Sequence, residues 1–203
     1  MQLSTSTNIH QVYRDNNYYI DAKESIQKCA EAGYKVLDIS LNSVSYPGRP
    51  MSMPNWKDWV YSIKEQFQKY NITPSQSHAF YYAHSKDPFG NVDLCEELIH
   101  RGIEASGILG VKWVVMHPIH GVDTEGKTIS EAIKMNAEYF KGYEEFAAHN
   151  GVGIAIENMI KGHMVSADEL LELLDVLDSP VFGTCWDTGH ANLSGQNQGE
   201  SIL

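Results

Sequence analysis

Short runs of apolar or β-branched residues, each of strand length, recur along this chain between longer segments with helical periodicity. From the second run onward, the centres of the runs are roughly 30 to 40 residues apart, which is the length of a strand, a helix and two loops. This alternation predicts a parallel sheet covered by helices. The six runs are QLSTST (2–7), KVLDISL (35–41), TPSQSHAF (73–80), KWVVMH (112–117), VGIAIE (152–157) and VFGTCWD (181–187).

The segments between the runs have the marks of amphipathic helices. Trp56, Val60 and Ile63 fall on one face of such a helix, and we expect this face to pack in the core. Ser166 and Glu169 have the spacing of a capping box, which predicts that a helix begins directly after Ser166.

Two architectures are compatible with this alternation, a doubly wound open sheet and a (β/α)8 barrel. No GxGxxG or GxxxxGK[ST] motif follows an early run, so the main phosphate-loop signals of the open sheet are missing. Polar side chains instead stand at the ends of four predicted strands, at His78, His117, Glu157 and Asp187. In a barrel these ends converge on one face, where the active site of this fold lies. We therefore predict an α/β fold of the TIM barrel type.

The length of the chain accommodates fewer units than a full barrel has. Six strand and helix units fill the 203 residues, whereas eight units need roughly 250 residues or more. We expect residues 1–203 to form a single barrel domain that is truncated after about six βα units, with its C-terminal part missing. We expect the final segment, QGESIL, to begin the sixth helix.

The charge balance and the cysteines argue against several classes of protein. Fifteen Lys and Arg against 26 Asp and Glu give a net charge of −11 and a pI near 5.2, which disfavours a nucleic-acid-binding surface. The three cysteines show no CxxC spacing, so neither a disulfide framework nor a Cys-based zinc site is indicated. No run approaches the roughly 18 apolar residues of a membrane span, and the N-terminus lacks a signal-peptide core. We expect a cytoplasmic protein that binds no membrane.

Two carboxylates at the ends of neighbouring strands indicate a bound cation. Glu157 and Asp187 each follow an otherwise apolar run, and adjacent parallel strands lie about 4.8 Å apart. The two charges would repel each other unless a positive group lay between them. A divalent ion (Mn²⁺, Co²⁺, Zn²⁺ or Mg²⁺) suits carboxylates accompanied by imidazole.

Four further side chains adjoin the predicted mouth of the barrel. His190 stands three residues after Asp187 and can reach the same centre, while His78 and His117 end earlier strands. Trp186 could form an apolar wall for a small polyol, and packing beneath the loops is an equal alternative for it.

At these positions the sequence resembles the xylose isomerase-like TIM barrel superfamily, which groups sugar isomerases and ketose 3-epimerases with the AP endonuclease family 2 proteins. The resemblance implies that Glu157 and Asp187 bind a divalent metal and that His190 contacts substrate or metal. For His78 and His117 it implies positions in the substrate pocket or, in the endonuclease branch, zinc ligation. It also implies a further His from a seventh strand and a Glu from an eighth, beyond the end of this sequence. The matching stretches are SHAF (77–80), VVMHP (114–118), IAIEN (154–158) and CWDTGHAN (185–192).

The activity implied by the resemblance is a metal-dependent sugar isomerase or ketose epimerase. It would act on a small sugar or polyol by proton abstraction next to a carbonyl, with Glu157 as the base. The alternatives are an AP endonuclease family 2-like metal-dependent endonuclease and a catalytically inactive sugar-binding barrel. The net charge of −11 weighs against a nucleic-acid substrate. The sequence does not decide whether the chain forms a homo-oligomer.

Overall fold

The computed structural model describes residues 4–10, 21–83, 89–197 and 199, and its six strands form one parallel sheet in the order β1-β2-β3-β4-β5-β6. Every strand pairs in parallel with the next strand along the chain. The six predicted runs are thereby confirmed as strands. Their bounds are β1 Thr5–Ser6, β2 Val36–Ser40, β3 Thr73–His78, β4 Trp113–Met116, β5 Gly153–Glu157 and β6 Phe182–Cys185.

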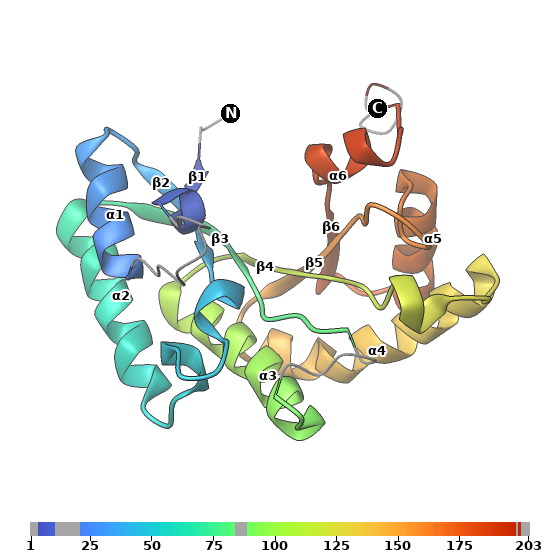
Figure 1. Cartoon of the computed structure of the whole chain (residues 1–203), viewed down its shortest axis with the longest axis horizontal. Helices are drawn as coiled ribbons and strands as arrows, with labels where there is room; N and C mark the ends of the chain where they lie inside the picture. Colours follow the sequence, from blue (N-terminus) through green and yellow to red (C-terminus); the bar gives the residue numbers. More distant parts are fainter. Residues whose placement is uncertain (1–3, 11–20, 84–88, 198, 200–203) are drawn as a thin grey trace.

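Helices connect the strands and lie along the outer side of their curved row (Figure 1). This strand order and helix placement is that of a (β/α)8 barrel, to which the described residues contribute six βα units. The helices are α1 Ala22–Glu31, α2 Trp56–Tyr70, α3 Val92–Leu109, α4 Ile129–His149, α5 Ala167–Leu177 and α6 Thr188–Leu193, with short 3-10 helices η1 Thr7–His10, η2 Asn42–Val44, η3 Pro50–Ser52 and η4 Gly121–Thr124.

The helix signals in the sequence are confirmed where they can be compared. The side chain of Ser166 caps α5, and Glu169 returns the bond to the Ser166 backbone, which completes the predicted capping box. A short helix that we did not predict, α6, begins at Thr188, because Asp187 accepts a hydrogen bond from the His190 N–H and so caps it. Of the expected helix start at QGESIL, residues 198 and 200–203 lie outside the described part.

Alternate residues of each strand face the helices, and these form the core. They pack against the apolar faces of the helices, including the predicted face of α2 with Trp56, Val60 and Ile63. The other strand residues face the inside of the barrel arc. The helix-facing strand residues are Leu37, Ile39, Val114, Met116, Ile154, Ile156 and Phe182.

The inside of the arc is filled at one end by a tryptophan and is polar at the other. Trp113 opens β4, and its indole lies so close to β5 that a Cβ atom on Gly153 would sit 2.3 Å from its Cζ3 atom. A Cβ atom on Gly183 would lie 3.2 Å from the same ring. The two glycines therefore make room for the indole near the strand starts, and the C-terminal strand ends remain for polar side chains. Within the described residues, no helix is long and apolar enough to cross a membrane.

Candidate metal centre and active-site cavity

The strand register brings the predicted site residues to one end of the sheet. His78 is the last residue of β3 and Glu157 the last residue of β5, while His117 directly follows β4. Met116 pairs with Ile156, so His117 and Glu157 are the next facing pair. Asp187 follows β6 by two residues. The convergence predicted from the sequence is thus present in the folded chain.

Two histidines and one carboxylate form the tightest part of this cluster. The Nε2 atom of His117 lies 2.8 Å from Oε2 of Glu157, and the Nε2 atom of His78 lies 3.2 Å from the same oxygen. The two Nε2 atoms are 3.2 Å apart. Only 7% of the Glu157 side chain is exposed, against 10% for His117. Three strands therefore each contribute one atom that could bind a metal ion, and these atoms meet at one largely buried place.

The protonation states of this cluster follow from its surroundings. Burial alone would raise the pKa of the Glu157 carboxyl, but hydrogen bonds from His117 and His78 hold that pKa well below its usual range. Burial lowers the pKa of His117, and the attraction of Glu157 offsets this only in part. Burial also acts to lower the pKa of His78, but the Glu157 carboxylate outweighs it and the pKa is raised. Glu157 is an ionised carboxylate, and His78 readily accepts a cation or a proton.

A cation suits the His78 side of the cluster on chemical grounds. The Nδ1 atom of His78 lies 2.9 Å from the backbone oxygen of Ala79, and because a carbonyl only accepts, this nitrogen carries the hydrogen. The Nε2 atom of a neutral His78 is therefore an acceptor that faces the Glu157 carboxylate. Two facing acceptors attract each other only with a proton or a metal ion between them, and a backbone carbonyl on the second ring nitrogen is common in histidine metal ligands.

A second group lies on the other side of Glu157. The Nδ1 atom of His190 is 3.8 Å from Oε1 of Glu157 and donates to the backbone oxygen of Asn158 at 2.8 Å. Asn158 also accepts from the Asp187 N–H at 2.6 Å and donates to the Asp187 carbonyl at 3.2 Å. Asn158 is fully buried and therefore fixes both Asp187 and His190, a role that we did not predict from the sequence.

The two groups share Glu157 and together offer two places for a metal ion. One group is His78, His117 and Glu157, and the other is Glu157, Asp187 and His190. Within each group the ligand atoms lie within 4.8 Å of one another. Imidazole nitrogens and carboxylate oxygens are the donors that Zn²⁺, Mn²⁺ and Co²⁺ accept, so the residues present fit a divalent ion.

A cavity of about 340 Å³ opens beside this cluster. Trp186 lines it, and in the described part of the chain its buried Nε1–H has no hydrogen-bond partner. Asp38 and Gln76 line the cavity as well, although we did not single them out from the sequence. The alternation of inward and outward side chains along each strand could have identified both, because each is a polar residue on the inward face. The lining residues are Asp38, Gln76, His78, Val115, Glu157, Cys185, Trp186, Asp187 and Thr188.

An aromatic side chain covers the imidazole of His117. The ring centroids of Tyr81 and His117 are 3.9 Å apart, with 25° between the ring planes. The neighbouring Tyr82 donates its hydroxyl to Glu96 on α3. Tyr81 therefore contacts the cluster through the His117 ring.

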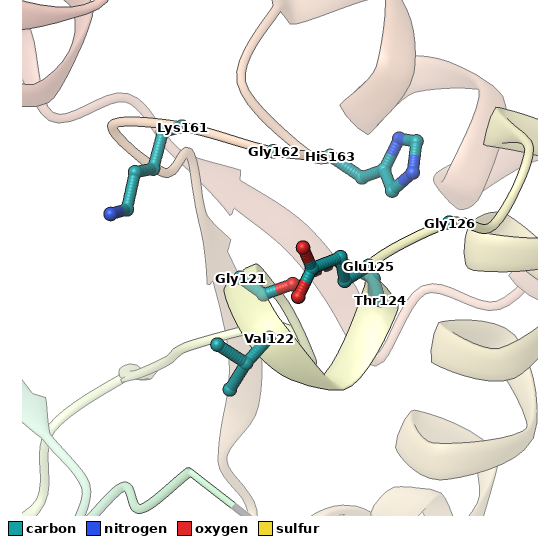
Figure 2. A pocket seen from close by; sticks show the side chains of 8 residues that line it. All are labelled: Gly121, Val122, Thr124, Glu125, Gly126, Lys161, Gly162 and His163. Carbon is teal, nitrogen blue, oxygen red and sulfur yellow. Dashed lines mark hydrogen bonds between the residues drawn. The ribbon is translucent and has the colours of Figure 1, made fainter.

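A further pocket of about 350 Å³ lies between the loops that follow β4 and β5. Figure 2 shows η4, with Val122, and the following Glu125 opposite the loop that carries Lys161 and His163. The His163 ring bonds to the backbone oxygen of Lys127 at 2.9 Å and so joins the two loops. None of the six predicted site residues lines this pocket.

Comparison with known proteins identifies the family of this arrangement. The xylose isomerase-like TIM barrel family matches residues 26–203. The chain is 31% identical over 105 residues to an uncharacterized protein of Methanocaldococcus jannaschii, and this match covers 50% of the chain and 36% of that relative's length.

Solved structures give the same result for the fold. A D-tagatose 3-epimerase-like protein matches with a TM-score of 0.74 at 22% identity, over 100% of this chain and 70% of that one. The IOLI protein with a binding zinc atom matches with a TM-score of 0.68 at 19% identity, over 97% of this chain and 66% of that one.

Proposed function

The chain belongs to the xylose isomerase-like TIM barrel family, and on that premise we propose that it is a metal-dependent sugar isomerase or epimerase. The observation that carries the proposal is the position of Glu157, an ionised carboxylate that faces histidines on one side and lies close to Asp187 and His190 on the other. The similarity to a D-tagatose 3-epimerase-like protein supports a sugar as the substrate.

The metal would be held by Glu157 and Asp187, with His190 as the third side chain of that group. A bound divalent ion would polarise a substrate carbonyl and thereby acidify the neighbouring C–H bond. The zinc atom of the similar IOLI structure supports a transition-metal ion. His78 and His117 provide the second place for an ion on the other oxygen of Glu157.

The chain's own residues would then perform the proton transfer. Glu157 is the base, because its carboxylate is ionised and lines the cavity. His117 and His78 orient this carboxylate through its Oε2 atom and leave Oε1 on the side of His190. Trp186 forms an apolar wall of the cavity and limits the access of water to the reacting carbon.

The endonuclease remains the second candidate, because His78, His117 and Glu157 form a compact metal-type group like the zinc site expected for that branch. The net charge of −11 disfavours it, since phosphate contacts are made by Lys and Arg.

Hydrogen exchange between solvent and substrate separates the candidates. The chain is incubated in D₂O with Mn²⁺ and either D-tagatose or D-fructose, and the proton at the carbon next to the carbonyl is followed by NMR. We expect deuterium at that carbon and none after chelation of the metal. Cleavage of an abasic-site duplex without exchange in the sugars would establish the endonuclease instead, and sugar binding without exchange would leave the inactive barrel.

A further inference from the structure

The cavity contains a third carboxylate that the proposed reaction does not use. Asp38 lies in the middle of β2 and lines the same cavity as His78 and Glu157. Its Oδ1 atom accepts a hydrogen bond from Ser6 on β1, and its Oδ2 atom accepts one from Gln76 on β3, both at 3.2 Å. Three neighbouring strands therefore hold this carboxylate in place.

The strand register puts Asp38 at the floor of the cavity. Ser40 is the register partner of His78, and Asp38 precedes Ser40 by two residues. It therefore points to the same face of the sheet and lies about 6.6 Å deeper along the strand. Gln76 precedes His78 in the same manner, so Asp38 and Gln76 form a polar layer beneath the metal-type cluster.

This carboxylate has acceptor capacity that its neighbours do not fill. An ionised carboxylate can accept about four hydrogen bonds, and Asp38 receives two, both from neutral donors. Among the described residues, no Lys, Arg or His forms an ion pair with it. Partial burial raises the pKa of the Asp38 carboxyl. The hydrogen bonds from Gln76 and Ser6 and the attraction of His78 offset this burial only in part. A carboxylate that is withdrawn from water with incomplete compensation destabilises the fold, and a role in ligand binding explains its presence.

We infer that Asp38, held by Ser6 and Gln76, binds hydroxyl groups of a polyhydroxy substrate, at the end remote from the carbonyl. The chemistry fits because sugar hydroxyls are neutral donors, and the two oxygens of one carboxylate can accept from neighbouring hydroxyls of one chain. A phosphate or carboxylate at this end of the substrate would be repelled. The inference rests on the proposed function for the reaction at Glu157. It adds that Asp38 and Gln76, at the floor of the cavity, favour substrates whose far end is an uncharged polyol.

The test measures the binding of sorbitol, an open-chain polyol that has no carbonyl and so cannot react. Affinity is measured by NMR titration of the full chain with Zn²⁺ present, for wild type, Asp38→Asn and the exposed control Asp175→Asn. We expect Asp38→Asn to weaken binding about tenfold to a hundredfold, as for hydrogen bonds to a charged group. Asp175→Asn should bind as the wild type does.

Monodeoxy derivatives of sorbitol identify the hydroxyls and do not depend on the stability of a variant. Wild type should lose about tenfold or more in affinity when one terminal hydroxyl or its neighbour is removed. Asp38→Asn should show little further loss for the same derivative. Equal binding of all derivatives by the wild type, absence of sorbitol binding, or unchanged binding by a folded Asp38→Asn protein would overturn the inference. Sorbitol has no carbonyl, so its binding does not depend on exchange of a carbon-bound hydrogen. If sorbitol binding depends on Asp38 but ketoses show no exchange, the proposed reaction is refuted and the inference about Asp38 stands.

Discussion

The Nε2 atom of His117 lies 2.8 Å from the Oε2 atom of Glu157, so the ends of the neighbouring strands β4 and β5 are joined by their side chains. Both side chains are at most 10% exposed, and the contact follows directly from the pairing of Met116 with Ile156 one residue earlier. The parallel register thereby places a carboxylate and an imidazole, which are both able to bind a metal ion, next to each other at the strand ends.

Replacement of Glu157 by Gln should strongly weaken metal binding in the cluster. The substitution removes the charge shared by both ligand groups. Loss of an outer partner of a ligand typically costs about tenfold to a hundredfold in metal affinity, and we expect at least the upper value here. Calorimetric titration with Zn²⁺ measures the change. The exposed Glu145 on α4 provides the control variant Glu145→Gln, and equal affinities of the two variants would refute the role of Glu157.

Zn²⁺ affinity should decrease as the pH falls, and the decrease should begin above the ordinary range of histidine. A metal binds the neutral imidazole, whereas the facing Glu157 carboxylate outweighs burial and raises the pKa of His78. Protons therefore compete with the metal already at pH values above about 6.5. Titrations between about pH 6 and pH 8 check this, with His78→Asn as the comparison. A wild-type profile no steeper than that of His78→Asn would show that His78 is not a ligand.

Asn158→Ala should destabilise the chain and disturb the second ligand group. The fully buried Asn158 side chain bonds both the N–H and the carbonyl of Asp187, and each buried group left unpaired costs about 1 to 3 kcal/mol. We expect urea unfolding to show a loss of at least about 2 kcal/mol. Asn55, which makes no side-chain cap bond at the start of α2, gives the control Asn55→Ala, expected to change stability by less than about 0.5 kcal/mol.

Two glycines, one facing the inside of the arc and one in a helix, provide a pair of substitutions with opposite expected effects on stability. Gly153→Ala places a Cβ atom 2.3 Å from the Trp113 ring, and overpacking of this kind costs about 1 to 3 kcal/mol. Gly142→Ala in α4 meets no atom within 4 Å and should stabilise the helix by up to about 1 kcal/mol. Thermal unfolding of both variants measures the difference. Equal melting temperatures would contradict the packing of Trp113 against β5.

The sequence predicts the convergence of His78, His117 and Glu157 because parallel strands end at the same edge of a barrel. The capping box at Ser166 could also be predicted, because it is a local pattern that depends only on residues close together in the sequence. We did not predict from the sequence that Asp187 caps a helix, although its side chain accepts a hydrogen bond from the His190 N–H at the start of α6.

Other features depend on three-dimensional contacts that no local pattern specifies. Asn158 follows Glu157 in the sequence, but its bonds reach Asp187, which is 29 residues away. The proton position on His78 depends on the Ala79 carbonyl. Asp38 interrupts an apolar run, and the period-2 pattern places it on the inward face of its strand, but only the folded chain shows that it lines the same cavity as Glu157.

The most direct test of the account is the position of a divalent ion in crystals of the chain grown with Zn²⁺ or Mn²⁺. Anomalous scattering at the metal edge locates the ion without any assumption about activity. The account predicts a peak at about 2.0 to 2.2 Å from a Glu157 carboxylate oxygen, with Asp187 and His190 or with His78 and His117 as the other ligands. Anomalous peaks only at sites away from Glu157, or no peak in the cavity at saturating metal, would contradict it.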